Sequence, residues 1–282
     1  MPTFGKSIKL FLLDGTPSGR WICELSNWTG KAYKIPRTAI KDCADRKDLT
    51  SSGVYFLFGV DDDSGKPLVY IGESENIYDR LKQHLDGKDF WNEVITFISK
   101  DEQLNKAHIK YLENRFYSIA TEADRYLIKN SNTPTKSTLS EAEEAEMEEF
   151  IHNAKILVAA QGHRVFEPVA QIAEGMNKTD SLFLIQTAKG VQAKGIPTSD
   201  GFVLLKGSII STSVSEKSVN IGIINLRNKC FSEGKVLDGV VQEDLLFTSS
   251  TYAADFALGY GVSGPKTWKN SRGKTLKEIE EG

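Results

Sequence analysis

Cysteine, histidine and long apolar runs are scarce in this 282-residue chain, and each scarcity argues against a class of protein. The three cysteines, Cys23, Cys43 and Cys230, lie far apart and form no CxxC pair. We therefore expect buried thiols in a reducing cytoplasm rather than a disulfide scaffold. The four histidines do not cluster, which argues against a zinc site. No run reaches the roughly 18 apolar residues of a membrane span, so no membrane partner is expected.

The N-terminus and the overall charge add two further expectations. The apolar patch in MPTFGKSIKLFLLDG is too short for a signal peptide and is followed by no small-residue cleavage pattern. We therefore expect a cytoplasmic protein, of two or three domains given its length. The formal net charge of −3 provides no global attraction for nucleic acid. Any contact with nucleic acid then requires a local basic surface.

The pattern along the chain predicts an α/β (α+β) fold in four segments. Residues 1–50 form a β-rich extension, and residues 136–170 form an acidic helical linker opened by a capping box of Ser140 and Glu143. Residues 171–282 form a β-rich C-terminal domain that includes SLFLIQ, GFVLLKGSII and SVNIGIINLR.

The central segment, residues 51–135, has the clearest local signals. Two strands, GVYFLFGV and LVYIG, are joined by the turn sequence DDDSGKP. Ser74 or Asn76 caps a helix after the second strand. The strand EVITFIS and a helix of about 20 residues follow, the helix with an apolar stripe that includes Ile109, Leu112 and Phe116.

The two hairpin strands contain GVY at 53–55 and YIG at 70–72, and Arg80 and Glu113 follow on the two helices. In this order and strand–helix context the segment resembles a GIY-YIG nuclease domain, with Val54 in place of the middle isoleucine. The resemblance implies a central three-stranded antiparallel sheet flanked by helices and a metal-dependent DNA endonuclease. It also implies an asparagine near the end of the segment, for which Asn132 is our choice and Asn130 the alternative.

Glu113 and Arg80 suit the hydrolysis of a phosphodiester bond, which needs an activated water and positive charge beside the phosphate. Glu113 borders the apolar stripe of its helix. A partly buried carboxylate of this kind fits as the ligand of one hard cation, Mg²⁺ or Mn²⁺. Arg80 presents a fork of donors to a phosphate. The alternatives are a salt bridge for Glu113 and an exposed helix face for Arg80.

Tyr55 and Tyr70 are the remaining pair. A phenol with a reference pKa of roughly 10 is a poor base at neutral pH unless positive charge, from Arg80 and a metal, favours the phenolate. Neutral His84, on the same helix face as Arg80, can accept the phenol's proton. The resemblance implies that one tyrosine activates the water, in some members with a histidine at this position. We assign this role to Tyr55 and the positioning of phosphate or water to Tyr70, with strand packing as the alternative for both.

Features outside the motif bear on the partners. The C-terminal third resembles an uncharacterised domain often fused behind GIY-YIG modules, mainly in FTSSTYAADFALG and TWKNSRGKTLKE. Its basic, aromatic tail predicts contact with a nucleic-acid backbone, and Lys82 extends a positive rim beside the motif. An ordinary surface with one packed tryptophan is the alternative for the tail. The predicted nucleic-acid contacts are Lys82, Lys266, Trp268, Lys269 and Arg272.

The sequence thus predicts a metal-dependent endonuclease that hydrolyses DNA, with RNA not excluded as a substrate. The alternative is a nucleic-acid-binding module whose nuclease centre is idle. The acidic helix has an alternative of its own, which is to shield the basic cleft as an electrostatic mimic of DNA. Substrate structure and oligomeric state stay open.

Overall fold

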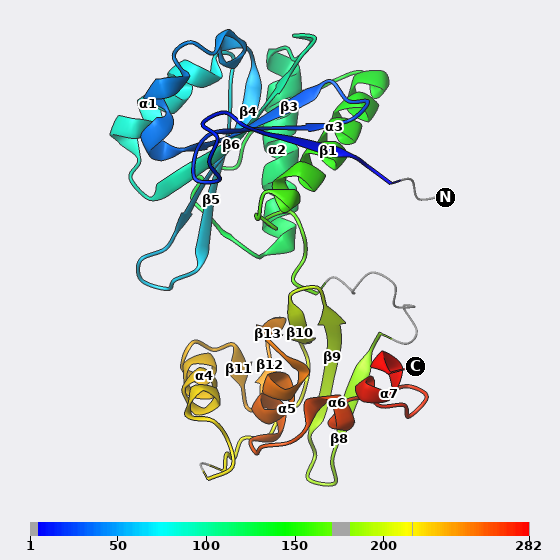
Figure 1. Ribbon diagram of the computed structural model, residues 1–282. Coiled ribbons are helices and arrows are strands. Elements are labelled where there is room, and N and C mark those ends of the chain that lie inside the picture. The colour runs from blue at the N-terminus through cyan, green and yellow to red at the C-terminus, as the bar shows by residue number, and fades with distance from the viewer. Residues whose placement is uncertain (1–4, 171–180, 216, 282) are drawn as a thin grey trace. The chain divides into compact units, whose positions relative to one another are not determined.

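The computed structural model describes residues 5–170, 181–215 and 217–281 of a mixed α/β chain (Figure 1). The chain divides into two compact units, Met1–Pro168 and Val169–Gly282. The expected mixture of helices and strands is confirmed, and Cys23, Cys43 and Cys230 are buried free thiols. Among the described residues, no helix combines the length and apolarity needed to cross a bilayer.

A seven-stranded sheet forms the centre of the first unit, in the order β1-β2-β3-β6-β4-β5-β7. Neighbouring strands are antiparallel, except for the short parallel pair of β5 and β7. The strands are β1 (Ile8–Leu12), β2 (Trp21–Leu25), β3 (Gly30–Pro36), β4 (Gly53–Val60), β5 (Pro67–Ser74), β6 (Trp91–Ser99) and β7 (Leu127–Ile128).

The strands of the β-rich extension predicted over residues 1–50 belong to this same sheet, so the extension and the central segment form one unit. Strand β3 pairs with β6 from Gly30↔Ser99 to Pro36↔Glu93. Without β3, the β6 edge of the central strands would expose unpaired backbone groups. Three short 3₁₀ turns connect β3 to β4, namely Arg37–Ala39, Lys41–Cys43 and Lys47–Thr50.

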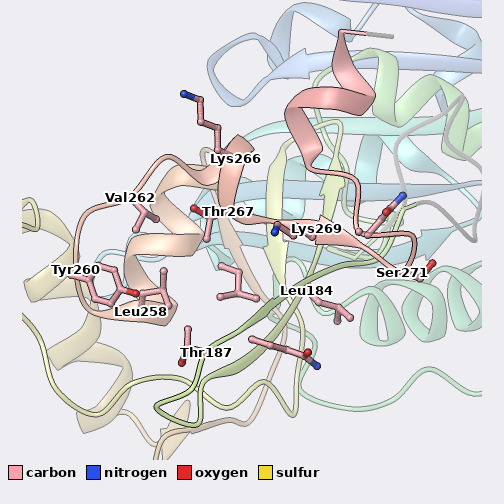
Figure 2. A pocket seen from close by; sticks show the side chains of 13 residues that line it. Leu184, Thr187, Leu258, Tyr260, Val262, Lys266, Thr267, Lys269 and Ser271 are labelled. Atoms are coloured by element: carbon pink, nitrogen blue, oxygen red, sulfur yellow. The ribbon is translucent and has the colours of Figure 1, made fainter.

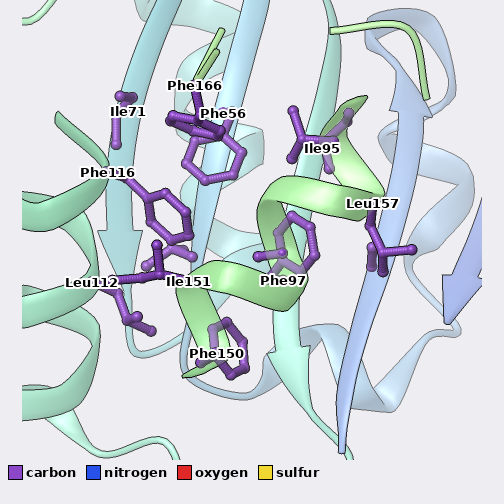
Figure 3. Close-up of a cluster of buried hydrophobic side chains, with 14 of the residues drawn as sticks. Phe56, Ile71, Ile95, Phe97, Leu112, Phe116, Phe150, Ile151, Leu157 and Phe166 are labelled. Atoms are coloured by element: carbon purple, nitrogen blue, oxygen red, sulfur yellow. The ribbon is translucent and has the colours of Figure 1, made fainter. Parts of the chain in front are cut away.

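Three helices flank the sheet of the first unit. They are α1 (Ile77–Gly87), α2 (Lys106–Ala123) and α3 (Glu141–Ala160). The alternation of β4 separates two apolar clusters. Phe56 and Phe58 pack with residues of α2 and α3, as Figure 3 shows for Phe56, whereas Tyr55 and Leu57 pack with residues of α1. Strand β4 is therefore covered on both faces, which explains its continuous apolar sequence.

Helix α3 was expected to be an acidic linker, and that expectation is wrong. The predicted capping box of Ser140 and Glu143 begins the helix. The Ser140 hydroxyl oxygen accepts from the Glu143 backbone N–H, and the Glu143 carboxylate accepts from the Ser140 backbone N–H. One face of α3 buries Phe150, Ile151 and Leu157 in the same cluster as β4 and α2 (Figure 3). The glutamates lie on the side of α3 that faces away from the apolar cluster.

The second unit contains a five-stranded sheet in the order β13-β10-β9-β8-β14 and a two-stranded hairpin. The sheet strands are β8 (Phe183–Gln186), β9 (Gln192–Thr198), β10 (Gly201–Leu204), β13 (Leu245–Phe247) and β14 (Lys269–Asn270). The hairpin pairs β11 (Val236–Leu237) with β12 (Val240–Val241), and the helices are α4 (Ile221–Ser232), α5 (Ser250–Leu258), α6 (Gly264–Thr267) and α7 (Leu276–Glu280).

One helix of this unit replaces predicted β structure. SVNIGIINLR contains Asn220, which caps α4, and the first residues of that helix; the TSSTYAADFALG stretch forms α5, which Ser249 caps. In α4 the buried residues are Ile223, Arg227 and Cys230, spaced as one helix face requires. A short apolar run can form either a strand or a helix, and the capping residues favour the helix here.

Candidate functional site

Tyr55 is placed at the centre of the site by strand geometry. It lies on β4 opposite Gly72 of β5, and its side chain is fully buried on the α1 side of the sheet. A β-carbon at position 72 would lie 2.4 Å from the Tyr55 hydroxyl oxygen. The glycine of YIG is therefore required because the Tyr55 ring crosses the backbone at that point.

Helix α1 brings two polar side chains to the Tyr55 hydroxyl. Asn76 caps the helix by accepting from the Asp79 backbone N–H, which fixes its first turn. One turn apart on that helix, Arg80 Nε donates to Tyr55 Oη at 3.2 Å and His84 Nε2 lies 2.7 Å from it. The sequence-predicted trio of Tyr55, Arg80 and His84 thus meets at one oxygen atom.

The protonation states at this oxygen follow from burial. Burial is the main cause that lowers the pKa of His84 to about 4, helped by the positive charges of Arg80, Lys88 and Arg37. Burial also raises the pKa of Tyr55, and this effect outweighs the opposing hydrogen bond from Arg80. At neutral pH His84 is neutral and Tyr55 keeps its proton. Arg80 favours the phenolate, as expected, but its effect on the pKa of Tyr55 is smaller than the opposing effect of burial.

Tyr70 forms a more accessible wall of the same site. Its ring stacks on Tyr55 with 6.2 Å between the centroids and meets the His84 ring edge-on at 5.5 Å. The Lys88 ammonium lies 3.8 Å from the centre of the Tyr70 ring. Tyr70 is half-buried where Tyr55 is fully buried. A ligand from solvent therefore meets Tyr70 before it meets Tyr55.

Positive charge surrounds His84 beyond the predicted residues. Arg37, in the turn after β3, donates to the backbone carbonyls of Leu85 and Lys88 and lies 4.5 Å from the centre of the Trp91 ring. These bonds fix the last turn of α1 and its basic residues in place. Arg37 could not be predicted here from local sequence patterns, because the pairing of β3 with β6 brings it near the motif.

Glu113 lies on α2, half-buried, and its carboxyl is strongly perturbed. Burial is the first cause that raises its pKa to about 7, and the negative charge of Glu73 is the second. Lys106, Arg80 and Lys110 partly oppose these effects. Arg80 on α1 and Glu113 on α2 therefore interact electrostatically, although their helices pack on opposite sides of the sheet near strand β5.

Glu73 is a site residue that sequence reasoning missed, and Lys106 is its ion-pair partner. Glu73 directly follows YIG on β5, and both of its carboxylate oxygens accept from Lys106 Nζ, at 2.9 and 3.0 Å. Lys106 also lies 3.5 Å from Glu75. Lys106 is thus shared between carboxylates and only partly offsets the negative charge around Glu113. The signal available in the sequence was the position of Glu73 beside the motif.

The residues present fit a hard divalent cation at Glu113. A half-buried carboxyl with a second carboxylate nearby has a deficit of positive charge, which a cation relieves. The described residues contain no group of three or more His, Cys, Asp or Glu side chains placed to hold a metal ion. Mg²⁺ needs no such group, because it keeps several waters and takes one or two carboxylates plus substrate phosphate.

The two candidate asparagines differ sharply. Asn130 follows β7, and its side-chain amide pairs with the backbone of Ile71, accepting at 3.0 Å and donating at 2.7 Å. Strand β7 pairs with Leu68 and Val69 of β5, and Asn130 continues this edge pairing two residues further along, at Ile71. Asn132 is exposed. The geometry favours the alternative, Asn130, as the asparagine that supports the YIG strand.

We expect Asn130→Ala to lower the free energy of unfolding by about 1–3 kcal/mol, because the buried Ile71 amide and carbonyl lose their partner. Asn132→Ala is the matched control and should change it by about 0.5 kcal/mol or less. Urea unfolding of both variants measures the difference. Equal effects of the two substitutions would contradict the role given to Asn130.

The predicted nucleic-acid contacts have mixed outcomes. Lys82 is exposed and pairs loosely with Asp79 at 3.9 Å, while Lys266, Lys269 and Arg272 are exposed in the second unit. Trp268 is fully buried, with its ring 4.6 Å from that of Phe202 and its Nε1 donating to the Ser250 carbonyl. Trp268 is therefore a core residue and not a surface contact, as the packed-tryptophan alternative stated.

Comparison with known proteins gives one family match, within the second unit. Residues 183–280 match a family described as a domain of unknown function, DUF4357. Searches of curated proteins and of solved structures found no match to the chain.

Proposed function

We propose that the first unit is a GIY-YIG endonuclease that hydrolyses phosphodiester bonds in DNA with one divalent cation. Strands β4, β5 and β6 with helices α1 and α2 form the proposed nuclease module, to which the N-terminal strands and α3 are added. The observation that carries the proposal is the Tyr55 hydroxyl, held between Arg80 Nε and His84 Nε2. Glu113 supports it as a carboxyl with a pKa near neutral in the same electrostatic neighbourhood.

A proton relay fits the protonation states better than a phenolate base. Neutral His84, with its proton on Nδ1, accepts the Tyr55 proton at Nε2 while Tyr55 Oη takes a proton from the attacking water. Tyr55 stays neutral throughout, so its raised pKa does not block the step. As the water loses its proton, its oxygen forms a bond to phosphorus and the bond from phosphorus to the leaving oxygen breaks. The proton rests on His84, from which the leaving oxygen or solvent can later take it.

Arg80 and Glu113 serve the phosphate in this scheme. Arg80 orients Tyr55 through Nε and offers the guanidinium charge to the phosphate oxygens. Glu113 would hold the cation, with Glu73 adding negative charge nearby. When bound, Mg²⁺ or Mn²⁺ supplies Lewis-acid stabilisation of the phosphate and the leaving oxygen. Tyr70 and Lys88 line the approach to the reacting group.

One observation favours the second candidate, a nucleic-acid-binding module without cleavage. The side chain of Tyr55 is fully buried, so water reaches its hydroxyl only when a covering side chain such as Arg80 or Tyr70 moves. A centre that never opens binds nucleic acid without cutting it. The nuclease and the binding module differ in whether the Tyr55 hydroxyl contributes to a reaction.

Tyr55→Phe keeps the packed ring and removes only the hydroxyl. We expect it to lower the cleavage rate of labelled DNA by about a hundredfold or more, the size of a lost acid–base group. Tyr33→Phe is the matched control, because Tyr33 is equally buried in the same cluster and donates its hydroxyl to Asp48. Equal rates for wild type and Tyr55→Phe would contradict the relay, and binding without cleavage by the wild type would support the second candidate.

A further inference from the structure

The second unit contains a pocket of about 700 Å³ beside the β8 and β14 edge of its sheet. Its walls come from β8 and the turn after it, the end of α5, helix α6, and β14 with its following turn. Figure 2 shows Tyr260 and Leu258 at one end of the pocket and Ser271 at the other, with Lys266 extending outward from the rim. Leu184, Leu258 and Val262 give it an apolar part.

The chemistry of the lining selects an anion that carries an apolar, planar group. Lys266 and Lys269 supply positive charge, and none of the described residues that line the pocket is acidic. Two other hollows differ in this respect, because one includes Asp101 and another includes Glu122. The segment from Phe256 to Lys277 contains no Asp or Glu at all in a chain of net charge −3. The positive field at this pocket is therefore local.

Tyr260 provides the second feature. The ring is 43% exposed at the pocket, although the aromatic Trp268 close by in sequence is fully buried. Its backbone continues from Gly259, which ends α5 at φ 75° in the left-handed region that favours glycine. An exposed ring in the same pocket as exposed ammonium groups is the combination on which a base stacks while its phosphates are neutralised.

The size of the pocket suits an unpaired nucleotide and not an intact duplex. A hollow of this volume lies in the range of small-ligand sites and accommodates one nucleotide. The bases of an intact duplex are stacked inside the helix and do not reach such a hollow. We propose that the pocket binds one unpaired nucleotide of a nucleic-acid strand, with its base against Tyr260 and its phosphates near Lys266 and Lys269. This proposal names the substrate class and rests on the proposed nuclease function, since it takes nucleic acid as the partner.

Fluorescence anisotropy of the full-length wild-type protein in EDTA tests the proposal without cleavage. The probes are a fully paired DNA duplex and the same duplex with a one-nucleotide bulge. We expect the bulged duplex to bind about tenfold tighter, the worth of one base stacked on an aromatic ring. Tyr260→Ala should remove this preference, whereas Tyr260→Phe should keep it.

Charge variants complete the test. Lys266→Ala with Lys269→Ala should weaken binding of both duplexes about tenfold or more by loss of phosphate contacts. Lys206→Ala with Lys229→Ala removes the same charge from exposed positions outside the pocket and should leave binding unchanged. Equal affinity for the two duplexes, or an unchanged preference in Tyr260→Ala, would overturn the proposal. Cleavage in Mg²⁺ is measured separately, so a nuclease that cuts without the bulge preference, and a bulge binder that cuts nothing, are told apart.

Discussion

Glu113→Gln is expected to lower DNA cleavage about a hundred- to thousandfold and, at the same time, to stabilise the fold above pH 7. The wild-type carboxyl has a pKa of about 7 in the folded protein against an ordinary value of 4.5. The folded state therefore holds a proton that the unfolded state has lost between these values, and wild-type stability falls as pH rises through this window. Glutamine mimics the neutral form at every pH. At pH 8 the variant should be more stable by about 1–3 kcal/mol.

Urea unfolding at pH 5 and pH 8 checks the sign, and the gain from Glu113→Gln should grow between the two. Glu122→Gln, an exposed glutamate on the same helix, is the matched control and should show no such growth. Mg²⁺ should raise the melting temperature of the wild type and not that of Glu113→Gln. The assignment of Glu113 is contradicted by wild-type cleavage in the variant, or by an equal stability difference at both pH values.

Arg80→Lys is expected to lower the cleavage rate about a hundredfold while changing the free energy of unfolding by about 1 kcal/mol or less. The lysine keeps the positive charge and loses the planar fork that orients Tyr55 through Nε and meets the phosphate. Single-turnover kinetics measure the rate apart from binding. Arg164→Lys, in the loop after α3, is the charge-matched control. If Arg80→Lys cleaves at the wild-type rate, positive charge alone is sufficient for cleavage. That result would contradict the role of Arg80 in orienting Tyr55.

Local signals predicted the hairpin and helix that build the site. The turn sequence between GVYFLFGV and LVYIG matches the β4–β5 hairpin, and Asn76, one of the two proposed caps, begins α1. These features depend on residues close in sequence, where turn and capping chemistry acts. Tyr55 and Arg80 were selected by the resemblance, and helix spacing placed His84 on the same face as Arg80. The structure brings the polar atoms of all three together.

Long-range contacts account for what the sequence did not predict. Arg37 reaches α1 only because β3 pairs with β6 across an intervening segment of the chain. The same pairing includes the N-terminal strands in the sheet, and α3 packs on the sheet through a face that its glutamates obscured in the sequence. The perturbed pKa values of His84 and Glu113 depend on burial in the folded unit, which no spacing rule gives. The asparagine choice also depended on edge pairing at Ile71.

Cleavage of supercoiled plasmid is the first test of the proposal that this chain cuts DNA with a divalent cation bound by Glu113. Wild-type protein is incubated with the plasmid and Mg²⁺ or Mn²⁺, beside an EDTA control and Glu113→Gln. We expect nicked circles before linear DNA, since one metal centre cuts one strand per encounter, and no product in either control. The proposal is contradicted if the wild type cuts neither plasmid nor branched DNA, single-stranded DNA or RNA while still binding one of them.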